Sequence, residues 1–239
     1  MEHPFMWYDI LPSPLRVFPQ HTFTSLLVMA VLLVLACRAR RALSQSADPV
    51  VPEEGVSARN VLELLVELVV GLSDSIIGVK GREYIHLFGS FFIFILAANL
   101  FGLLPGFSPP TNNLNTTLGL GLVSFCAYHY FGMREHGAGY IKQFLGPMMI
   151  LAPFFLVLEG ISHLVRPFSL ALRLFGNMFG DHLVLSIFSG LIPYLVPIVF
   201  YVIGLFVCFM QAFVFTLLTM VYIGLSTEHH DHGDEVEHH

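Results

Sequence analysis

Long apolar runs, separated by short polar segments, dominate the chain. The runs cover residues 23–36, 87–104, 114–131, 146–165 and 183–225. A helix needs ~20 mostly apolar residues to cross a hydrocarbon core of ~30 Å, and several of the runs reach or approach that length. The last run is about twice as long. The pattern therefore predicts an integral membrane protein of the all-α class.

Five membrane helices are predicted, at about residues 21–37, 83–104, 115–133, 147–190 and 193–226. The last two are expected to form a hairpin, and each is too long for a perpendicular crossing. At ~1.5 Å per residue the fourth helix would extend about 65 Å. It must therefore tilt strongly or bend, and Pro167 offers a place for a kink. Residues 1–20 are rich in proline and are expected to form an extended extracytoplasmic arm.

Residues 57–80 have a different pattern, in which apolar positions recur at helical spacing among charged ones. The apolar positions are Leu62, Leu65, Val66, Val69 and Leu72, and the charged ones are Arg59, Glu63, Glu67 and Asp74. This predicts an amphipathic helix at the membrane surface or packed beside the spans.

The distribution of basic residues predicts the orientation. Arg38, Arg40 and Arg41 follow the first span and mark the cytoplasmic side by the positive-inside rule. Eight of the eleven Lys and Arg residues fall in segments expected inside. We therefore expect the N-terminus outside, and a cytoplasmic His- and acid-rich tail at residues 227–239.

Composition supports the membrane class and limits the kinds of binding partner to be expected. Only 12% of residues are charged and 55% are hydrophobic, whereas soluble domains carry about 25% charged residues. The net charge of −6 does not suggest a nucleic-acid partner. Cys37, Cys126 and Cys208 are expected to be lone buried thiols. The tail could bind a transition metal, but a solvated end is the simpler interpretation.

A polar stripe marks the fourth span. Relative to Arg173, five polar residues fall with it in an 80° sector of the helix: Glu159, Ser162, Arg166, Ser169 and Asn177. The stripe covers 18 residues, or ~27 Å of helix. Charge at bilayer depth is costly and normally faces a partner or a wet cavity. The alternative interpretation is that the Ser and Asn residues serve only as contacts between helices and that Arg166 extends to the inner interface.

Two further polar groups lie on the last helix, where Gln211 and Tyr222 share a face. Gln211 could likewise serve only as a contact between helices. His182 lies opposite Arg173 on its own helix.

Three segments together resemble subunit a of F-type rotary ATP synthases. Residues 166–180, Arg-Pro-Phe-Ser-Leu-Ala-Leu-Arg-Leu-Phe-Gly-Asn-Met-Phe-Gly, resemble the signature of that family. Residues 99–107, followed by Pro-Pro-Thr and Leu-Asn-Thr-Thr, are similar to its turn between early spans. Residues 211–222 are similar to its last helix.

The resemblance implies a stationary subunit that lies against a rotating ring of c subunits and is held by a b-subunit peripheral stalk. Two half-channels would reach opposite membrane faces, and Arg173 would be the essential charge between them. Asn177 and Gln211 match polar positions near the outer half-channel. Glu159, Ser162 and Ser169 match positions toward the inner one, and Tyr222 matches a tyrosine near the helix end. The transported ion would be H⁺, with Na⁺ possible, and no cofactor is expected.

The chain departs from the familiar pattern of the family at two positions. An acidic residue nine positions after the arginine and a histidine seven before the glutamine are replaced by His182 and Gly204. Asp181 is adjacent. We therefore expect Asp181 and His182 together to supply the titratable function of the outer half-channel, since His titrates near neutrality.

Two other classes of function are alternatives to this interpretation. A stand-alone secondary transporter would use the stripe as a substrate path, but no internal repeat is evident. A membrane enzyme would need a metal site, for which His86, His129, His163 and His182 are candidates; no HExxH or comparable spacing occurs. Without a transit peptide, a bacterial inner membrane is the expected location.

Overall fold

The computed structural model describes Tyr8 and residues 19–45, 58–104, 106–137, 152–191 and 195–227. Regular structure in these ranges is entirely helical, which confirms the predicted all-α class for this part of the chain. Most of the N-terminal arm, most of the linker after the first span, and the His-rich tail from residue 228 lie outside the described residues. The expectations for them stay predictions.

Six long helices and two short 3₁₀ helices make up the described chain. They are α1 (Gln20–Gln45), α2 (Ala58–Ile76), η3 (Val79–Tyr84), α3 (Ile85–Gly102), η4 (Pro110–Asn112), α4 (Leu114–His136), α6 (Ala152–Leu191) and α7 (Leu195–Thr227). Compared with the expected first span, α1 continues eight residues further, through its basic residues.

Three described segments are long and apolar enough to cross a membrane: Gln20–Arg41, Val79–Gly102 and Ile198–Thr227. Helix α6 is long enough at 40 residues, but charged side chains recur about every second turn, at Glu159, Arg166, Arg173 and Asp181. Apolar composition alone therefore does not mark α6 as a span, and the predicted number of five crossings stays a prediction.

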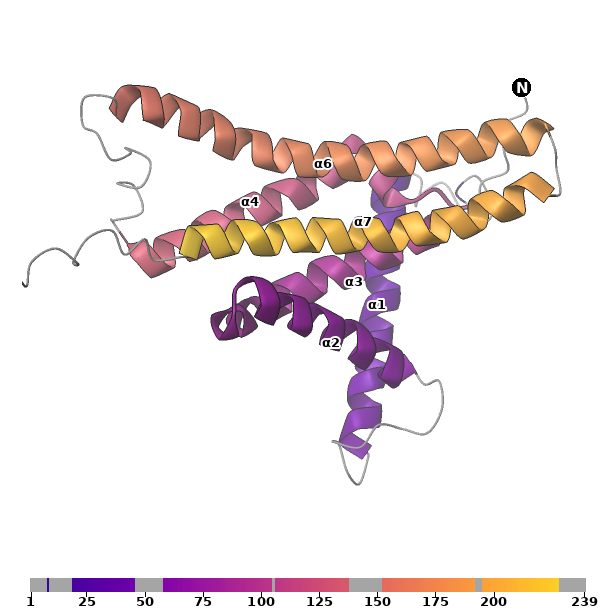
Figure 1. The fold of residues 1–239 in the computed structure, drawn as a ribbon. Coiled ribbons are helices and arrows are strands. Elements are labelled where there is room, and N and C mark those ends of the chain that lie inside the picture. The colour runs from indigo at the N-terminus through magenta and orange to yellow at the C-terminus, as the bar shows by residue number, and fades with distance from the viewer. Residues whose placement is uncertain are drawn as a thin grey trace, which may run out of the picture.

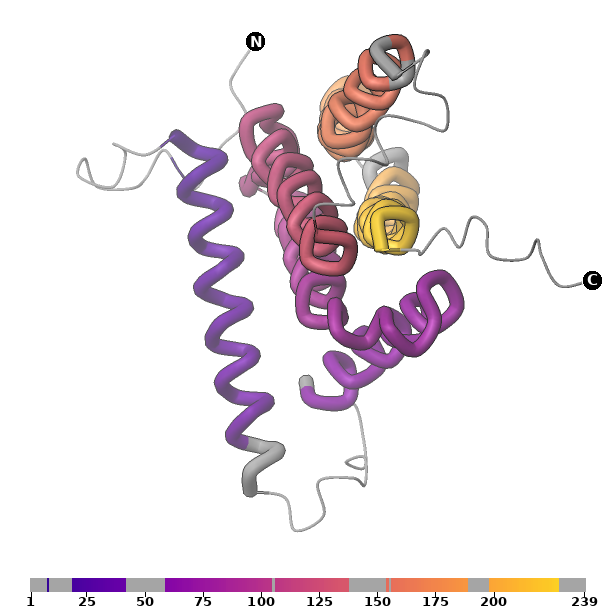
Figure 2. Tube along the Cα trace, turned by 90° about the vertical axis from the view of Figure 1, so that its left-hand side faces the viewer, coloured from indigo at the N-terminus to yellow at the C-terminus, as the bar shows by residue number. Residues whose placement is uncertain are grey.

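The helices cross at steep angles. In Figure 1, α1 runs from top to bottom, whereas α6 and α7 lie side by side across the view. Figure 2 looks nearly along these two helices, and in it α1 stands apart at one side. Helix α7 packs against α2, α3, α4 and α6, while α6 packs against α4, η4 and α7. Helix α6 therefore lies at the edge of the bundle.

The core is formed chiefly where α3 meets the second half of α7. Phe88, Phe92 and Ile95 of α3 are fully buried, together with Phe215 and Ile223 of α7. Small polar groups also join α4 to α7, as is common between membrane helices: the hydroxyls of Ser124 on α4 and Thr219 on α7 lie 3.0 Å apart. The first half of α7 differs, since Val199, Val202 and Phe206 are exposed in this chain.

Helix α6 buries only a single stripe. Leu170, Ala171, Leu174 and Met178 are 0–2% exposed and recur at helical spacing. The opposite face is apolar but uncovered, with the exposed residues Phe168, Leu172, Phe179, Leu183 and Ile187. A broad open face on a membrane helix is available either to lipid or to another protein.

Close approach of α4 and α6 depends on Gly121. A Cβ at that position would lie 2.7 Å from the carbonyl oxygen of Pro167, so any side chain there would force the helices apart. Pro167 lies inside α6, which continues through it as one helix and curves along its length (Figure 1).

Local signals in the chain account for the ends of α4. The Asn113 side chain accepts a hydrogen bond from the Asn115 backbone N–H at 2.9 Å, as an N-cap does. Gly137, with φ +54°, follows the last turn, where only glycine adopts such a conformation at little cost. Arg134 and His136 in that turn suit the negative end of the helix dipole.

The amphipathic helix α2 turns its apolar side to the body. Val69 is fully buried, and Leu65 and Leu72 pack against the core, as the spacing predicts. The expectation of three buried thiols is wrong for two of them: Cys208 is buried, but Cys37 and Cys126 are exposed, because their faces of α1 and α4 point away from the core of the chain.

Candidate functional site

A groove between α6 and α7 collects most of the polar residues predicted for the outer half-channel. Arg173, Asn177 and Asp181 are spaced four residues apart and so share one face of α6. With Gln211 of α7 they line a groove of about 530 Å³. The remaining lining side chains are apolar, mainly from the exposed half of α7. The groove is therefore an apolar cleft with a short row of polar groups.

Asn177 and Gln211 hold the two helices together inside this groove. The Asn177 Nδ2 group donates to the Gln211 Oε1 atom at 2.5 Å. Gln211 is 3% exposed, and its own Nε2 group has no hydrogen-bond partner among the described residues. A buried amide donor without a protein partner is costly, and water in the groove would satisfy it.

Asp181 lies against Gly204. A Cβ built on Gly204 would come within 3.0 Å of the Asp181 Oδ2 atom and within 3.0 Å of Leu103 Cδ2. Glycine at this position therefore leaves the space that the carboxylate occupies. The position seven residues before Gln211, where the sequence lacks the expected histidine, is thus filled by an acid from the neighbouring helix.

Arg173 has no counter-ion among the residues that the structure describes. It is exposed on the groove face of α6, and within the described ranges it forms no salt bridge. Glu159, the nearest acid before it on the same helix, is engaged elsewhere. The guanidinium thus offers its positive charge to whatever covers the open face.

His182 does not join Asp181 in the groove. It is half-buried and does not belong to the lining residues, since adjacent residues of a helix point about 100° apart. The structure therefore separates the two residues that we expect to act together.

A second polar cluster lies nearer the start of α6 and bridges to α4. The Tyr128 hydroxyl lies 2.8 Å from His163 Nδ1, and His163 Nε2 lies 3.0 Å from Glu159 Oε1. An ionised carboxylate only accepts, so Nε2–H donates to Glu159. A neutral imidazole then accepts the Tyr128 hydroxyl proton at Nδ1.

Pro167 helps to explain this second cluster. Proline has no N–H, so the carbonyl of His163, four residues earlier, loses its helical partner. The Tyr128 hydroxyl lies 3.5 Å from that carbonyl. The ring of His129 stacks on the ring of His163, with centroids 5.2 Å apart.

Arg166 and Tyr222 belong to the second cluster as well. The Arg166 Cζ atom lies 5.2 Å from the Tyr222 ring centroid and 6.0 Å from that of Tyr128, within the range of cation–π attraction. Arg166 thus packs among rings of the protein. Ser162 is exposed and Ser169 is half-buried on the same helix.

Sequence reasoning missed Tyr128 altogether and named His163 only as a possible metal ligand. The pair Glu159 and His163, four residues apart, was a usable signal, but the contact with α4 was not. No group of three or more metal-ligating side chains occurs among the residues that the structure describes.

Comparison with known proteins identifies the family of this chain. The sequence model for the ATP synthase A chain family matches residues 22–224. The chain belongs to this family. It is 46% identical over 229 residues to ATP synthase subunit a of Bdellovibrio bacteriovorus, covering 95% of this chain and 99% of that protein.

Two other members of the ATP synthase A chain family are similar over most of their lengths. ATP synthase subunit a 3 of Pelobacter propionicus is 43% identical over 236 residues, which are 95% of this chain and 99% of that protein. ATP synthase subunit a 1 of Syntrophotalea carbinolica is 45% identical over 211 residues, 88% of this chain and 87% of its own. The match includes both polar clusters, since both lie between residues 22 and 224.

Proposed function

We propose that this chain is the stationary proton-translocating subunit of a rotary ATP synthase. The observation that carries the proposal is the exposed Arg173, which lies on the groove face of α6, beside the open face, and has no acidic partner among the described residues. Family membership supplies the context. On this account the open face meets a ring of c subunits, each with a membrane-buried carboxylate.

Arginine suits this position because it keeps its proton in proteins and cannot relay one. Its charge favours the ionised form of a carboxylate that passes within a few ångströms. A ring carboxylate beside Arg173 is therefore held deprotonated until it moves to a wet channel. The same charge repels protons that would cross directly between the channels.

The outer half-channel is the groove between α6 and α7. Asn177, Gln211 and Asp181 line it, and the unpartnered Gln211 amide is a place for water. Asp181 is the proton-exchanging group in the groove, and His182 acts from outside its lining.

The inner half-channel runs along the earlier part of α6, past Glu159, Ser162 and Ser169. The side chain of Glu159 is 45% exposed even while it accepts from His163, so it can exchange protons with water. Tyr222 supports this region by packing against Arg166.

The membrane arrangement follows from the helix directions. On this proposal α1 follows the membrane normal, and α6 and α7, which lie side by side across the view of Figure 1, are the strongly tilted pair of the predicted hairpin. Five helices cross, α2 lies at the inner surface, the N-terminus is outside and the C-terminus is inside. The location is a bacterial inner membrane. A driving force of ~2.3 kcal/mol per proton per 100 mV then turns the ring.

The chain performs no chemistry of its own and needs no cofactor. It is an ion-channel subunit of the larger ATP synthase, in which a b-subunit stalk holds it still. The coupling ion is H⁺, and Na⁺ would demand a matching site on the ring. The secondary-transporter alternative is not favoured, since the matching family is that of ATP synthase A chains.

Cross-linking tests the proposed surface. We expect cysteines introduced at Leu172, on the open face of α6, or at Phe206, in the exposed half of α7, to form disulfides with the carboxylate-bearing helix of the ring in purified ATP synthase. Leu122 of α4, equally exposed at 53%, is the matched control and should not cross-link. Equal cross-linking at all three positions would contradict the assignment of the open face.

The outer half-channel is tested by replacing its titratable residues. Asp181→Leu with His182→Leu should slow ATP-driven proton pumping while the complex stays assembled. Because only Asp181 lines the groove, Asp181→Leu alone should account for most of the loss. Unchanged pumping in the double variant would exclude both residues.

A further inference from the structure

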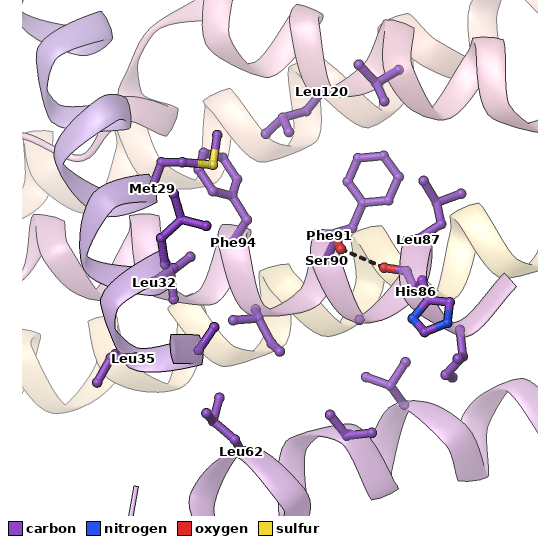
Figure 3. Close-up of a pocket in the computed structure, with 18 residues that line it drawn as sticks. Met29, Leu32, Leu35, Leu62, His86, Leu87, Ser90, Phe91, Phe94 and Leu120 are labelled. Carbon is purple, nitrogen blue, oxygen red and sulfur yellow. Dashed lines mark hydrogen bonds between the residues drawn. The ribbon is translucent and has the colours of Figure 1, made fainter. Parts of the chain in front are cut away.

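A large apolar groove on the far side of the bundle from α6 has no part in the proposed proton path. It has a volume of about 700 Å³ and lies where α1, α2, α3 and α4 meet. Figure 3 shows Met29 and Leu32 of α1 on one side, Phe94 and Phe91 of α3 on another, and Leu62 of α2 below. Its Ser90 hydroxyl already donates to the His86 carbonyl at 2.6 Å. An apolar ligand fits this lining.

A second groove adjoins the first at the cytoplasmic end of α1. It has a volume of about 600 Å³, and Leu62 and Val66 of α2 line both grooves. Along α1 the lining passes from Ala36 in the first groove to Ala39 and Arg40 in the second. One elongated ligand could therefore occupy both.

Two basic and two acidic side chains line the second groove, and only one of each is in an ion pair among the described residues. Arg59 and Glu63 pair with each other at 2.6 Å. Arg40 and Glu67 also line this groove, and neither has an ion pair among the described residues. Among the described residues, one basic and one acidic side chain of this groove therefore have no ion pair, and both lie next to the first, apolar groove.

We propose that these two grooves together bind a zwitterionic phospholipid with a primary amine, that is, a phosphatidylethanolamine. The acyl chains lie against Met29, Leu32 and Phe94. The phosphate binds Arg40, whose guanidinium forms charge-assisted hydrogen bonds to phosphate oxygens. The headgroup ammonium donates to the Glu67 carboxylate.

The depth of the site matches a lipid in one leaflet. From Met29 to Arg40 is eleven residues of α1, or ~16 Å of rise. One leaflet contributes half of a hydrocarbon core of ~30 Å. A lipid whose phosphate lies at Arg40 therefore ends its chains near Met29. Basic residues beside a groove between membrane helices on the cytoplasmic side are a known setting for phospholipid headgroups.

Headgroup chemistry separates this lipid from others. A phosphatidylcholine has the same charges, but its quaternary ammonium has no N–H to donate to Glu67. A phosphatidylglycerol has a phosphate for Arg40 and no cation for Glu67, which would repel the anionic headgroup. We therefore expect the order phosphatidylethanolamine, then phosphatidylcholine, then phosphatidylglycerol.

The test uses the intact ATP synthase, delipidated and then incubated with vesicles of one of these three lipids. Lipid retained on subunit a after washing is measured by native mass spectrometry. Phosphatidylethanolamine should be retained on the wild-type subunit, and Arg40→Gln should lower its retention roughly fivefold, as the loss of one basic contact near a headgroup predicts. Arg38→Gln is the matched control, because Arg38 lies at the same helix end and lines neither groove.

A second pair of variants fills space without touching charge. Gly89 lines the apolar groove, and a Cβ there meets nothing within 4 Å. Gly89→Leu should therefore fold and displace the acyl chains, so retention falls. Gly119→Leu is its control, because Gly119 is equally open on α4 but does not line the groove.

Three results would overturn the proposal. Equal retention of the three lipids would indicate a general lipid shell. Equal loss in Arg38→Gln and Arg40→Gln would indicate attraction by the basic helix end as a whole. A photo-crosslinker at Leu33 that joins another protein chain, and no lipid, would show that a protein helix occupies the groove.

Discussion

The Asp181 carboxylate and the backbone of Gly204 are in contact across the α6–α7 groove: a Cβ on Gly204 would lie 3.0 Å from Asp181 Oδ2. The two positions are therefore coupled, since an acid on α6 uses the space that glycine leaves on α7. This relationship explains how the chain can dispense with a large polar side chain at position 204. It also makes Gly204 a sensitive point of the proposed outer half-channel.

Gly204→Ala is expected to impair proton pumping by displacing Asp181 and Leu103. Overpacking of this kind costs about 1–3 kcal/mol, which corresponds to a loss of roughly fivefold in rate at the lower end. Gly224→Ala on the same helix is the control, because its Cβ would meet only Ile77 Cγ1 at 3.4 Å. ATP-driven acidification of vesicles measures both variants, and equal activities would contradict the coupling.

Gln211→Leu is expected to weaken the contact between α6 and α7. It leaves the Asn177 amide without its acceptor, and because Asn177 is exposed, the cost is the net contribution of one hydrogen bond, about 0.5–1.5 kcal/mol. Because one hydrogen bond is lost either way, Asn177→Leu combined with Gln211→Leu should cost less than the sum of the single changes. Thermal release of the subunit from the complex provides the measurement. Additive effects would show that the amides act independently.

Tyr128→Phe removes the hydroxyl that bonds His163 while it keeps the ring beside Arg166. The loss should be about 0.5–1.5 kcal/mol, the usual net contribution of one hydrogen bond, and should be seen as a lower unfolding temperature of the subunit. Tyr130→Phe is the matched control on the same helix, since the Tyr130 side chain is 60% exposed. If Tyr130→Phe lowered the unfolding temperature as much, the loss in Tyr128→Phe could not be assigned to the hydrogen bond with His163.

The ion pair between Asp74 and Arg82 predicts a small pH dependence of stability. Arg82 Nη2 lies 2.7 Å from Asp74 Oδ2, and this hydrogen bond lowers the pKa of the Asp74 carboxyl. A lowered folded-state pKa stabilises the protein above the unfolded pKa of about 3.9, and the stabilisation is lost as pH falls through the folded value. The difference in unfolding temperature between wild type and Asp74→Asn should therefore be small, present at pH 7, and should shrink as the pH falls below the unfolded pKa until it vanishes below the folded pKa. A difference in unfolding temperature that stays constant from pH 7 to low pH would contradict this role of the ion pair.

The sequence predicted helices well because membrane helices carry their pattern locally. Long apolar runs gave α1, α3 and α7, and the mixed spacing of α2 gave its amphipathic character. Boundaries were less accurate where the local signal is weak: α1 continues to Gln45 through arginines that suited the end of a span. The kink expected at Pro167 is a gradual curve, because α4 packs tightly there through Gly121.

The polar stripe was predicted as one line on one helix face, and the structure divides it in two. Arg173 and Asn177 line the groove with α7. Glu159 instead bonds His163 of its own helix, and Arg166 packs between the rings of Tyr128 on α4 and Tyr222 on α7. Helical angles specify the direction of a side chain and not its neighbours. The proximity of Asp181 to Gly204 depends on how α6 packs against α7. No pattern along the chain could predict it.

The central claim is that Arg173 offers a permanent charge to a moving acid on another subunit. It is tested most directly by Arg173→Ala in the intact ATP synthase reconstituted into vesicles, with ATP-driven pumping and passive proton flux measured on the same preparation. The account predicts that pumping is lost while the complex remains assembled and protons leak passively between the half-channels. Pumping at the wild-type rate in an assembled Arg173→Ala complex would contradict it.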